Sequence, residues 1–302
     1  MNALEQALQQ INQVVLGKPH TVKLALTCLL AEGHLLLEDI PGVGKTTLAH
    51  TLAATLGLGF QRIQFTADLL PADIIGISIY QRDTQRFVFH PGPLFSQLVL
   101  ADEINRAPPK TQSALLEAME ERQLTLDGQT RPLPDPFFVI ATQNPAQQIG
   151  TYPLPESQLD RFLMRLSLGY PPPAAERDLL RGSDRQAMLR TLPARLPPDT
   201  LQPLQQAARQ IHVADALLDY IMALLQASRQ SLHIASGLSP RAGLALLKAA
   251  RAYALLERAP AVLPDHVQAV FPAVASHRLV LQADQPASDA DARSLLAQVP
   301  IP

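Results

Sequence analysis

The stretch LLLEDIPGVGKTTLAH, residues 35–50, joins an apolar run to a glycine-containing turn and the start of a helix. A strand, a turn and a helix in this order are typical of a phosphate-binding loop, in which backbone N–H groups and the helix N-terminus hold an anion. The general pattern of such loops, G-x-x-x-x-G-K-[ST], requires a glycine where this chain has Asp39. The rest of the sequence has to decide whether the loop binds a nucleotide.

The residues expected to contact phosphate and metal are present in this loop. Two glycines, Gly42 and Gly44, allow the backbone to approach a phosphate without an intervening Cβ. Lys45 can reach the β- and γ-phosphates, and the Thr46 hydroxyl can bind Mg²⁺. A chance lysine in a glycine-rich turn is the alternative, but GKT in this setting favours ATP and Mg²⁺ as ligands. The expected contacts to the nucleotide are Pro41, Gly42, Val43, Gly44, Lys45, Thr46 and Thr47.

Composition restricts the class of protein. The chain has 302 residues, of which 47% are apolar and 17% charged, so it can bury one large core or two unequal domains. A net charge of −2 gives no general attraction to nucleic acid or to an anionic membrane. The single cysteine, Cys28, excludes an internal disulfide framework. Neither a signal peptide nor an apolar stretch of ~18 residues is found, so we expect a cytoplasmic protein without membrane insertion.

Apolar runs alternate with helical stretches as far as residue 168. This alternation predicts an α/β domain in which a parallel five-stranded sheet lies between helices. Residues 3–31 are expected to be helical, with a break near Gly17 and Pro19. The five expected strands are residues 34–38, 60–65, 97–102, 137–142 and 162–168.

Two β-hairpins are predicted within this frame. GISIY (76–80) and RFVFH (86–90) flank a polar segment, and Asp127-Gly128 in QLTLDGQTRPL (123–133) is a strong two-residue hairpin signal. Both hairpins could be edge decoration without a function.

Three consecutive prolines after the last expected strand predict a domain boundary. We therefore expect a nucleotide-binding domain over residues 1–170 and a linker with the start of a lid over 171–200. Residues 201–302 show a helical pattern and predict a small all-α lid domain. The small, polar composition from residue 283 onward favours a frayed tail.

Polar side chains follow two of the expected strands. Asp102 and Glu103 end the apolar run LVLADE; Asp102 suits the holding of a magnesium-bound water and Glu103 the polarisation of an attacking water. Adjacent acids are a weak signal alone and a strong one beside a GKT loop. Asn144 ends FFVIATQNP and could contact the attacking water or the γ-phosphate, with Thr142 as a weaker substitute. An ordinary turn closed by Asn-Pro remains the alternative.

Two arginines are candidates for contacts with an anion. Ser239 and Pro240 are a good N-cap and first helical residue, which places Arg241 in a first turn where its charge opposes the helix dipole. Arg161 precedes the fifth expected strand, and local reasoning does not separate a functional role from a surface ion pair.

Taken together, these segments resemble the MoxR family of AAA+ ATPases. The resemblance covers residues 14 to about 270 and rests on EDIPGVGKTTLA, LVLADEINRAPPKTQSALLEAMEE, FFVIATQNP, YPLPESQLDRF and GLSPRA. It implies an AAA+ P-loop core with two hairpin insertions, followed by a helical lid. An acidic residue at the position of Asp39 is a familiar variant in this family. The implied site consists of Walker A (Lys45, Thr46), Walker B (Asp102, Glu103), sensor 1 (Asn144), sensor 2 (Arg241), an arginine finger for the neighbouring subunit's ATP (Arg161) and an adenine contact (Val15, Leu16, Gly17).

The resemblance also implies partners. A trans-acting finger implies a ring of identical subunits, expected to be a hexamer. Family members are chaperone-like machines that act on protein complexes, often with a von Willebrand factor A domain protein, which here would be a separate chain. A nucleic-acid motor or loader is an alternative that the slightly acidic net charge disfavours. A nucleotide-gated scaffold with little turnover is the other, against which Glu103, Asn144 and Arg161 argue.

The sequence makes one further prediction about Asp39. A carboxylate aimed at a bound phosphate would repel it. We therefore expect this side chain to turn away from the phosphate site, onto nearby backbone N–H groups or a basic side chain.

Overall fold

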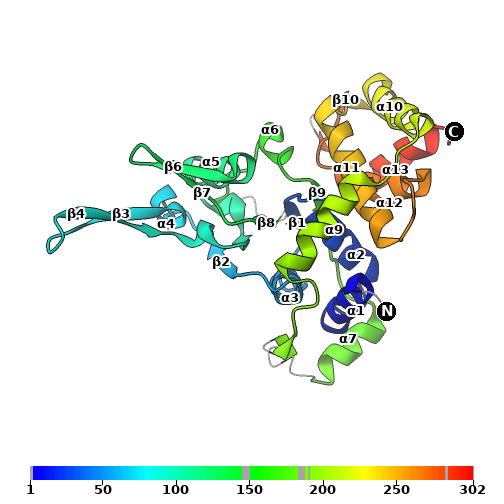
Figure 1. The fold of residues 1–302 in the computed structure, drawn as a ribbon. Helices are drawn as coiled ribbons and strands as arrows, with labels where there is room; N and C mark the ends of the chain where they lie inside the picture. Colours follow the sequence, from blue (N-terminus) through cyan, green and yellow to red (C-terminus); the bar gives the residue numbers. More distant parts are fainter. Residues whose placement is uncertain (1–2, 145–149, 183–187, 190, 283–284, 302) are drawn as a thin grey trace.

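The protein is described by a computed structural model that covers residues 3–144, 150–182, 188–189, 191–282 and 285–301. A central sheet separates two β-hairpins on one side from a group of helices on the other (Figure 1). Positions 183–187, 190 and 283–284, which fall in the predicted linker and tail, lie outside the described residues.

All five strands of the central sheet run parallel, in the order β2-β5-β8-β1-β9. Strand β1 therefore lies between β8 and β9, and the predicted α/β fold with five strands is confirmed. The bounds are β1 Leu35–Glu38, β2 Phe60–Gln64, β5 Leu98–Asp102, β8 Phe138–Gln143 and β9 Met164–Leu166.

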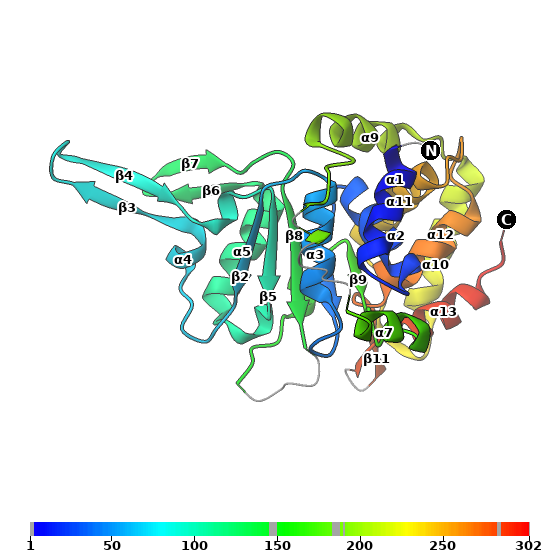
Figure 2. The same ribbon diagram turned by 90° about the horizontal axis from the view of Figure 1, so that it is seen from below.

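Alternate residues of each strand enter two different cores, as the pleat requires. Leu35 and Leu37 of β1 pack with helices on one face, whereas Leu36 packs on the other face. The first face is covered by α1 (Ala3–Val14), α2 (Pro19–Leu30) and α3 (Lys45–Thr55), and the second by α5 (Pro109–Glu121) (Figure 2). The predicted break between two N-terminal helices is confirmed.

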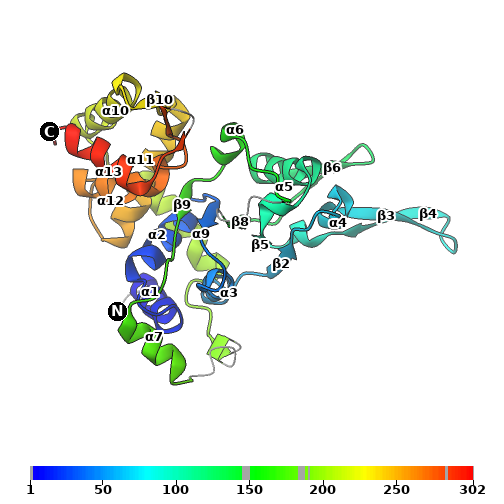
Figure 3. The same ribbon diagram turned by 180° about the vertical axis from the view of Figure 1, so that it is seen from behind.

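Both predicted hairpins are present and extend from the same end of the sheet (Figure 3). Strands β3 (Gly76–Gln81) and β4 (Arg86–Pro91) follow the short helix α4 (Pro71–Ile75), and β6 (Gln123–Leu126) pairs with β7 (Gln129–Pro132). The hairpins contact each other, because the Ser78 hydroxyl donates to the Asp127 carboxylate at 2.7 Å.

The C-terminal part is mainly helical, as predicted, with two differences. Strands β10 (Ile234–Ser236), β11 (Val280–Leu281) and β12 (Gln285–Pro286) form a small antiparallel sheet. Strands of two or three residues are too short to show an alternating pattern. The tail is also not frayed after residue 288, because Ser288 and Asp291 cap a helix reciprocally. The helices are α7 Pro173–Leu180, α9 Pro198–Gln210, α10 Asp215–Gln230, α11 Pro240–Leu256, α12 Pro264–Ala275 and α13 Asp289–Gln298.

The lid packs tightly on the core. Its buried residues continue the apolar cluster of the first sheet face. Arg278, which follows α12, has a side chain only 5% exposed and donates to the Asp160 carboxylate at 2.6 Å and to the backbone oxygen of Phe162 at 2.7 Å. Burial lowers the pKa of Arg278, and the bond and charge of Asp160 oppose that shift. None of the described helices combines the length and apolar character needed to cross a bilayer.

Candidate active site

The carboxyl ends of β1, β5 and β8 meet at one edge of the sheet, where open α/β folds bind their ligands. A cavity of about 370 Å³ lies at this edge. It is lined by Pro41, Gly42, Gly44, Lys45, Thr46, Thr47, Asp102, Glu103, Thr142, Gln143 and Asn144. The structure therefore brings together most of the residues that the sequence predicted for phosphate, metal and water.

The loop between β1 and α3 adopts a conformation that requires glycine. Gly42 has φ +83° and Gly44 has φ +98°, and helix α3 begins at the next residue, Lys45. An added Cβ at either glycine would meet no atom within 4 Å. The requirement for glycine therefore comes from the backbone conformation and not from crowding within the chain.

The Lys45 ammonium lies at the cavity and is held by the loop itself. Its Nζ donates to the backbone oxygen of Asp39 at 2.6 Å and to that of Ile40 at 3.0 Å. Burial lowers the pKa of Lys45, whereas the negative charges of Asp39, Asp102 and Glu103 act in the opposite direction. A triphosphate in the cavity would meet a cation that is already positioned.

Asp39 points away from the phosphate loop, which confirms the prediction for this residue. The residue is buried, with 7% of its surface exposed. One carboxylate oxygen accepts from Ser167 Oγ at 2.9 Å and from the N–H groups of Leu168 and Gly169, each at 2.6 Å. The other accepts from the N–H of Ile40 at 2.9 Å. The side chain thus joins the loop to the segment that follows β9.

The Asp102 carboxylate is held from both neighbouring strands. It accepts from Arg62 Nη2 of β2 at 2.7 Å and from Thr142 Oγ1 of β8 at 2.6 Å. Thr142 in turn accepts from the N–H of Glu103 at 2.8 Å. Sequence reasoning missed Arg62 and considered Thr142 only as a substitute for Asn144. The register of the parallel strands would have identified Arg62. It pairs Gln64 with Asp102, so Arg62, two residues earlier in β2, comes within reach of the Asp102 carboxylate.

Glu103 has an unusual backbone. Its φ of 59° lies in the left-handed region, which costs a residue other than glycine about 1–3 kcal/mol and is common at functional sites. Its carboxylate accepts from Gln64 Nε2 at 3.0 Å and forms an ion pair with Arg106 Nε at 3.2 Å. Glu103 thus lines the cavity with its carboxylate held by Gln64 and Arg106.

Residues predicted to contact the attacking water and the magnesium ion also line this cavity. Asn144 is buried and lines it. The Thr46 hydroxyl and the Asp102 carboxylate line it as well, and such oxygen donors are the kind that Mg²⁺ prefers when waters and phosphates complete its coordination. The donor set therefore fits a magnesium nucleotide.

A smaller cavity of about 210 Å³ adjoins the loop and shares Gly42, Gly44 and Thr47 with the first. Val15 and Leu16 line it, as expected for an apolar contact with a base. Gly17 does not line it: its φ is +71°, and an added Cβ would lie 2.6 Å from Pro172 Cδ. This glycine permits close packing of the N-terminal turn on the residue before α7.

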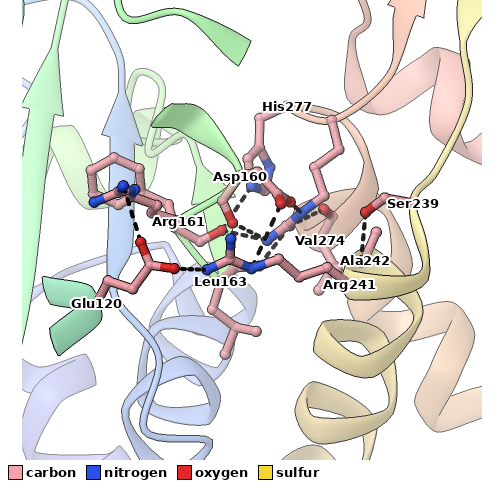
Figure 4. Close-up of polar contacts among 11 residues, drawn as sticks. Glu120, Asp160, Arg161, Leu163, Ser239, Arg241, Ala242, Val274 and His277 are labelled. Carbon is pink, nitrogen blue, oxygen red and sulfur yellow. Dashed lines mark hydrogen bonds and ion pairs between the residues drawn. The ribbon is translucent and has the colours of Figure 1, made fainter. Parts of the chain in front are cut away.

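The structure does not bring Arg161 and Arg241 to the phosphate loop. They line a separate cavity of about 310 Å³ together with Gly33 and His34, which precede β1. Arg161 precedes β9 in the same way. Since β1 and β9 are parallel, this cavity lies at the edge of the sheet opposite to the loop. Both arginines are drawn in Figure 4, where each contacts Glu120.

Comparison with known proteins identifies relatives over nearly the whole chain. Residues 34–164 match the ATPase family associated with various cellular activities (AAA), and residues 226–298 match the AAA lid domain. The chain is 46% identical to the uncharacterized protein YeaC of Bacillus subtilis over 296 residues, covering 98% of this chain and 92% of that protein. It is 42% identical to Chaperone MoxR1 of Mycobacterium tuberculosis over 294 residues, covering 94% and 77%.

A solved structure shows the same fold. The crystal structure of an ATPase candidate from Cytophaga hutchinsonii superposes with a TM-score of 0.88 at 34% sequence identity. The match covers 99% of this chain and 95% of that one. Protein MoxR of Paracoccus denitrificans is 34% identical over 321 residues, covering 97% of this chain and 94% of that protein.

The Asp39 contacts lead to a prediction about stability. In Asp39→Ala, three buried or partly buried backbone N–H groups lose their acceptor, so we expect a loss of about 2–4 kcal/mol in the free energy of unfolding. Asp39→Asn keeps one acceptor oxygen and should lose less. Urea denaturation of both variants measures the difference, and an alanine variant within about 0.5 kcal/mol of the wild type would contradict the assigned role.

Proposed function

The chain belongs to the MoxR family of AAA+ ATPases, and on this premise we propose that it hydrolyses Mg-ATP at the interfaces of a ring of identical subunits. The observation that carries the proposal is the separation of two sets of residues. The phosphate loop and the carboxylates lie at one edge of the sheet, and two arginines with the properties of anion contacts lie at the other.

Binding of the nucleotide is assigned to the loop and the apolar cavity next to it. The backbone of residues 41–47 and the Lys45 ammonium receive the phosphates, and Val15 and Leu16 contact the adenine. Mg²⁺ would be held by the Thr46 hydroxyl, with Asp102 holding one of its waters, and would neutralise charge on the β- and γ-phosphates. Arg62 and Thr142 donate to the two oxygens of the Asp102 carboxylate and fix its direction.

Hydrolysis is assigned to Glu103 and Asn144. Glu103 accepts a hydrogen bond from the attacking water and polarises it, after exchanging its contacts with Gln64 and Arg106. Asn144 contacts the same water or the γ-phosphate from the neighbouring strand β8. Glu103 is the first residue after β5, and it lines the same cavity as Asp102.

Charge on the γ-phosphate is stabilised by a neighbouring subunit. Arg161 lies before β9 and the phosphate loop lies after β1, so the two are at opposite edges of one sheet. Arg161 is therefore assigned to the ATP of the next subunit, where an arginine accelerates phosphoryl transfer by about 10³–10⁵-fold. Arg241 lies in the same cavity and is assigned to the same neighbouring nucleotide, not to its own. Such contacts repeat around a closed ring, for which we propose six subunits.

The work done by the ring is proposed to be chaperone-like remodelling of a protein complex in the cytoplasm. A relative that is 42% identical is named a chaperone. The β3–β4 hairpin exposes Ile77, Ile79, Tyr80 and Phe87, which suits contact with a protein better than with nucleic acid. The family resemblance supports a partner chain with a von Willebrand factor A domain that selects the client.

Replacement of Glu103 tests the assignment of hydrolysis. Glu103→Gln keeps the shape of the side chain but removes the base, so Mg-ATP should still bind while turnover falls about 100-fold or more. Lys45→Ala is the negative control, because it should not bind the nucleotide. Fluorescent-nucleotide titration and phosphate release measure the two properties. Turnover in Glu103→Gln at the level of the wild type would remove Glu103 from its role, and turnover near zero in the wild type would favour a nucleotide-gated scaffold.

Replacement of Arg161 tests whether this arginine acts on the ATP of the neighbouring subunit. Arg161→Ala should bind Mg-ATP normally and lose about 10³-fold in turnover. The specific activity of the wild type should rise with subunit concentration as interfaces form. Steady-state ATPase assays over a range of subunit concentrations measure both effects, and an Arg161→Ala monomer with full activity would exclude the trans assignment.

A further inference from the structure

One carboxylate joins the two arginines at the edge opposite to the phosphate loop (Figure 4). Glu120 Oε2 lies 3.0 Å from Arg161 Nη2, and Glu120 Oε1 accepts from Arg241 Nη2 at 3.1 Å. Each oxygen thus contacts a different guanidinium. The glutamate belongs to the last turn of α5, Arg161 to the loop before β9, and Arg241 to the first turn of lid helix α11.

The position of Arg241 makes an anion at this point favourable. Ser239 caps α11 by accepting from the N–H of Ala242 at 3.1 Å, which fixes Arg241 near the positive end of the helix dipole. A cation there is unfavourable unless a negative charge is close. In the single subunit Glu120 supplies that charge at 3.1 Å, and Asp160 Oδ2 lies farther away, 3.8 Å from Arg241 Nε.

The surroundings are cationic. Five basic side chains line this cavity against three acidic ones. Glu32 pairs with Arg122 of this cavity and with Arg209 outside it, and Asp160 pairs with Arg278 and, at 3.8 Å, with Arg241. The basic residues are Arg122, Arg161, Arg241, Lys248 and Arg278, and the acidic ones are Glu32, Glu120 and Asp160. The cavity therefore suits an anion with more charge than a single carboxylate provides.

The ion pairs of Glu120 are also weak enough to exchange. Glu120 is 37% exposed, Arg161 29% and Arg241 54%, so water screens both pairs. A triphosphate from a neighbouring subunit carries more negative charge and would approach in an interface from which water is excluded, where such contacts are stronger.

We propose that Glu120 is an internal counter-ion that occupies Arg161 and Arg241 in the free subunit and is displaced by the triphosphate of the neighbouring subunit when the ring closes. This inference rests on the proposed trans action of Arg161. Because the glutamate competes with the phosphate for the same two guanidinium groups, it raises the subunit concentration that assembly requires. Glu120 also holds Arg241, and with it α11, on the core until that exchange. Arg241 of the lid and Arg161 then leave Glu120 and bind the triphosphate in the same step.

Replacement by glutamine tests this competition without removing the side chain. Glu120→Gln should lower the subunit concentration that gives half-maximal ATPase activity about threefold to tenfold, with maximal turnover per subunit unchanged. Glu121→Gln is the matched control, because it removes the same charge from an exposed neighbour on α5. Steady-state ATPase assays at saturating Mg-ATP give the midpoint, and sedimentation with a non-hydrolysable ATP analogue gives assembly independently of turnover. Thermal unfolding verifies that both variants are folded.

Two results would overturn the inference. A midpoint in Glu120→Gln that is unchanged or raised, with or without a fall in maximal turnover, would make the glutamate a structural support. A shift of equal size in Glu121→Gln would make it a general effect of charge. Failure of the trans assignment is recognised separately, because Arg161→Ala alone would then keep its turnover. If Arg161→Ala is inactive and the Glu120→Gln midpoint does not move, only the counter-ion is wrong.

Discussion

The parallel direction of the five strands is the constraint from which the proposed chemistry follows. In a parallel sheet, residues that follow one strand and residues that precede its neighbour lie at opposite edges. The phosphate loop follows β1, and Arg161 precedes the adjacent β9. One chain can therefore offer a triphosphate at one edge and guanidinium groups at the other, but it cannot bring them together. Two copies arranged head to tail can bring the triphosphate of one chain to the guanidinium groups of the other. A heterologous contact of that kind repeats until it closes into a ring.

Asp39 connects this arrangement to the rest of the chain. The residue departs from the general pattern of phosphate loops, yet its carboxylate accepts from the N–H groups of Leu168 and Gly169 beyond β9. The loop is thereby fixed to the segment that leads into the lid. At the other end of β9, Arg278 of the lid holds the residues on both sides of Arg161. The segments at the two ends of this short strand are therefore bonded to the phosphate loop at one edge and to the lid at the other.

Local patterns predicted most of the fold and most of the residues that line the cavity at the phosphate loop. Apolar runs located all five strands, and residues at their carboxyl ends, such as Asp102, were found because a strand end is visible in sequence. Arg62, Thr142 and Glu120 were missed as partners because their roles depend on strand register or on contacts between distant segments. The short strands β10–β12 have too few residues for a periodic signal. The capping pair Ser288 and Asp291 was visible and would have predicted α13.

Complementation between two inactive variants tests most directly whether neighbouring chains share one site. Lys45→Ala keeps Arg161 but lacks a nucleotide site, and Arg161→Ala keeps the nucleotide site but lacks the arginine. Co-expression with two different affinity tags and sequential purification yields rings that contain both chains. We predict that ATPase activity returns in these mixed rings while each variant alone stays inactive. Mixed rings as inactive as the separate variants would contradict the account.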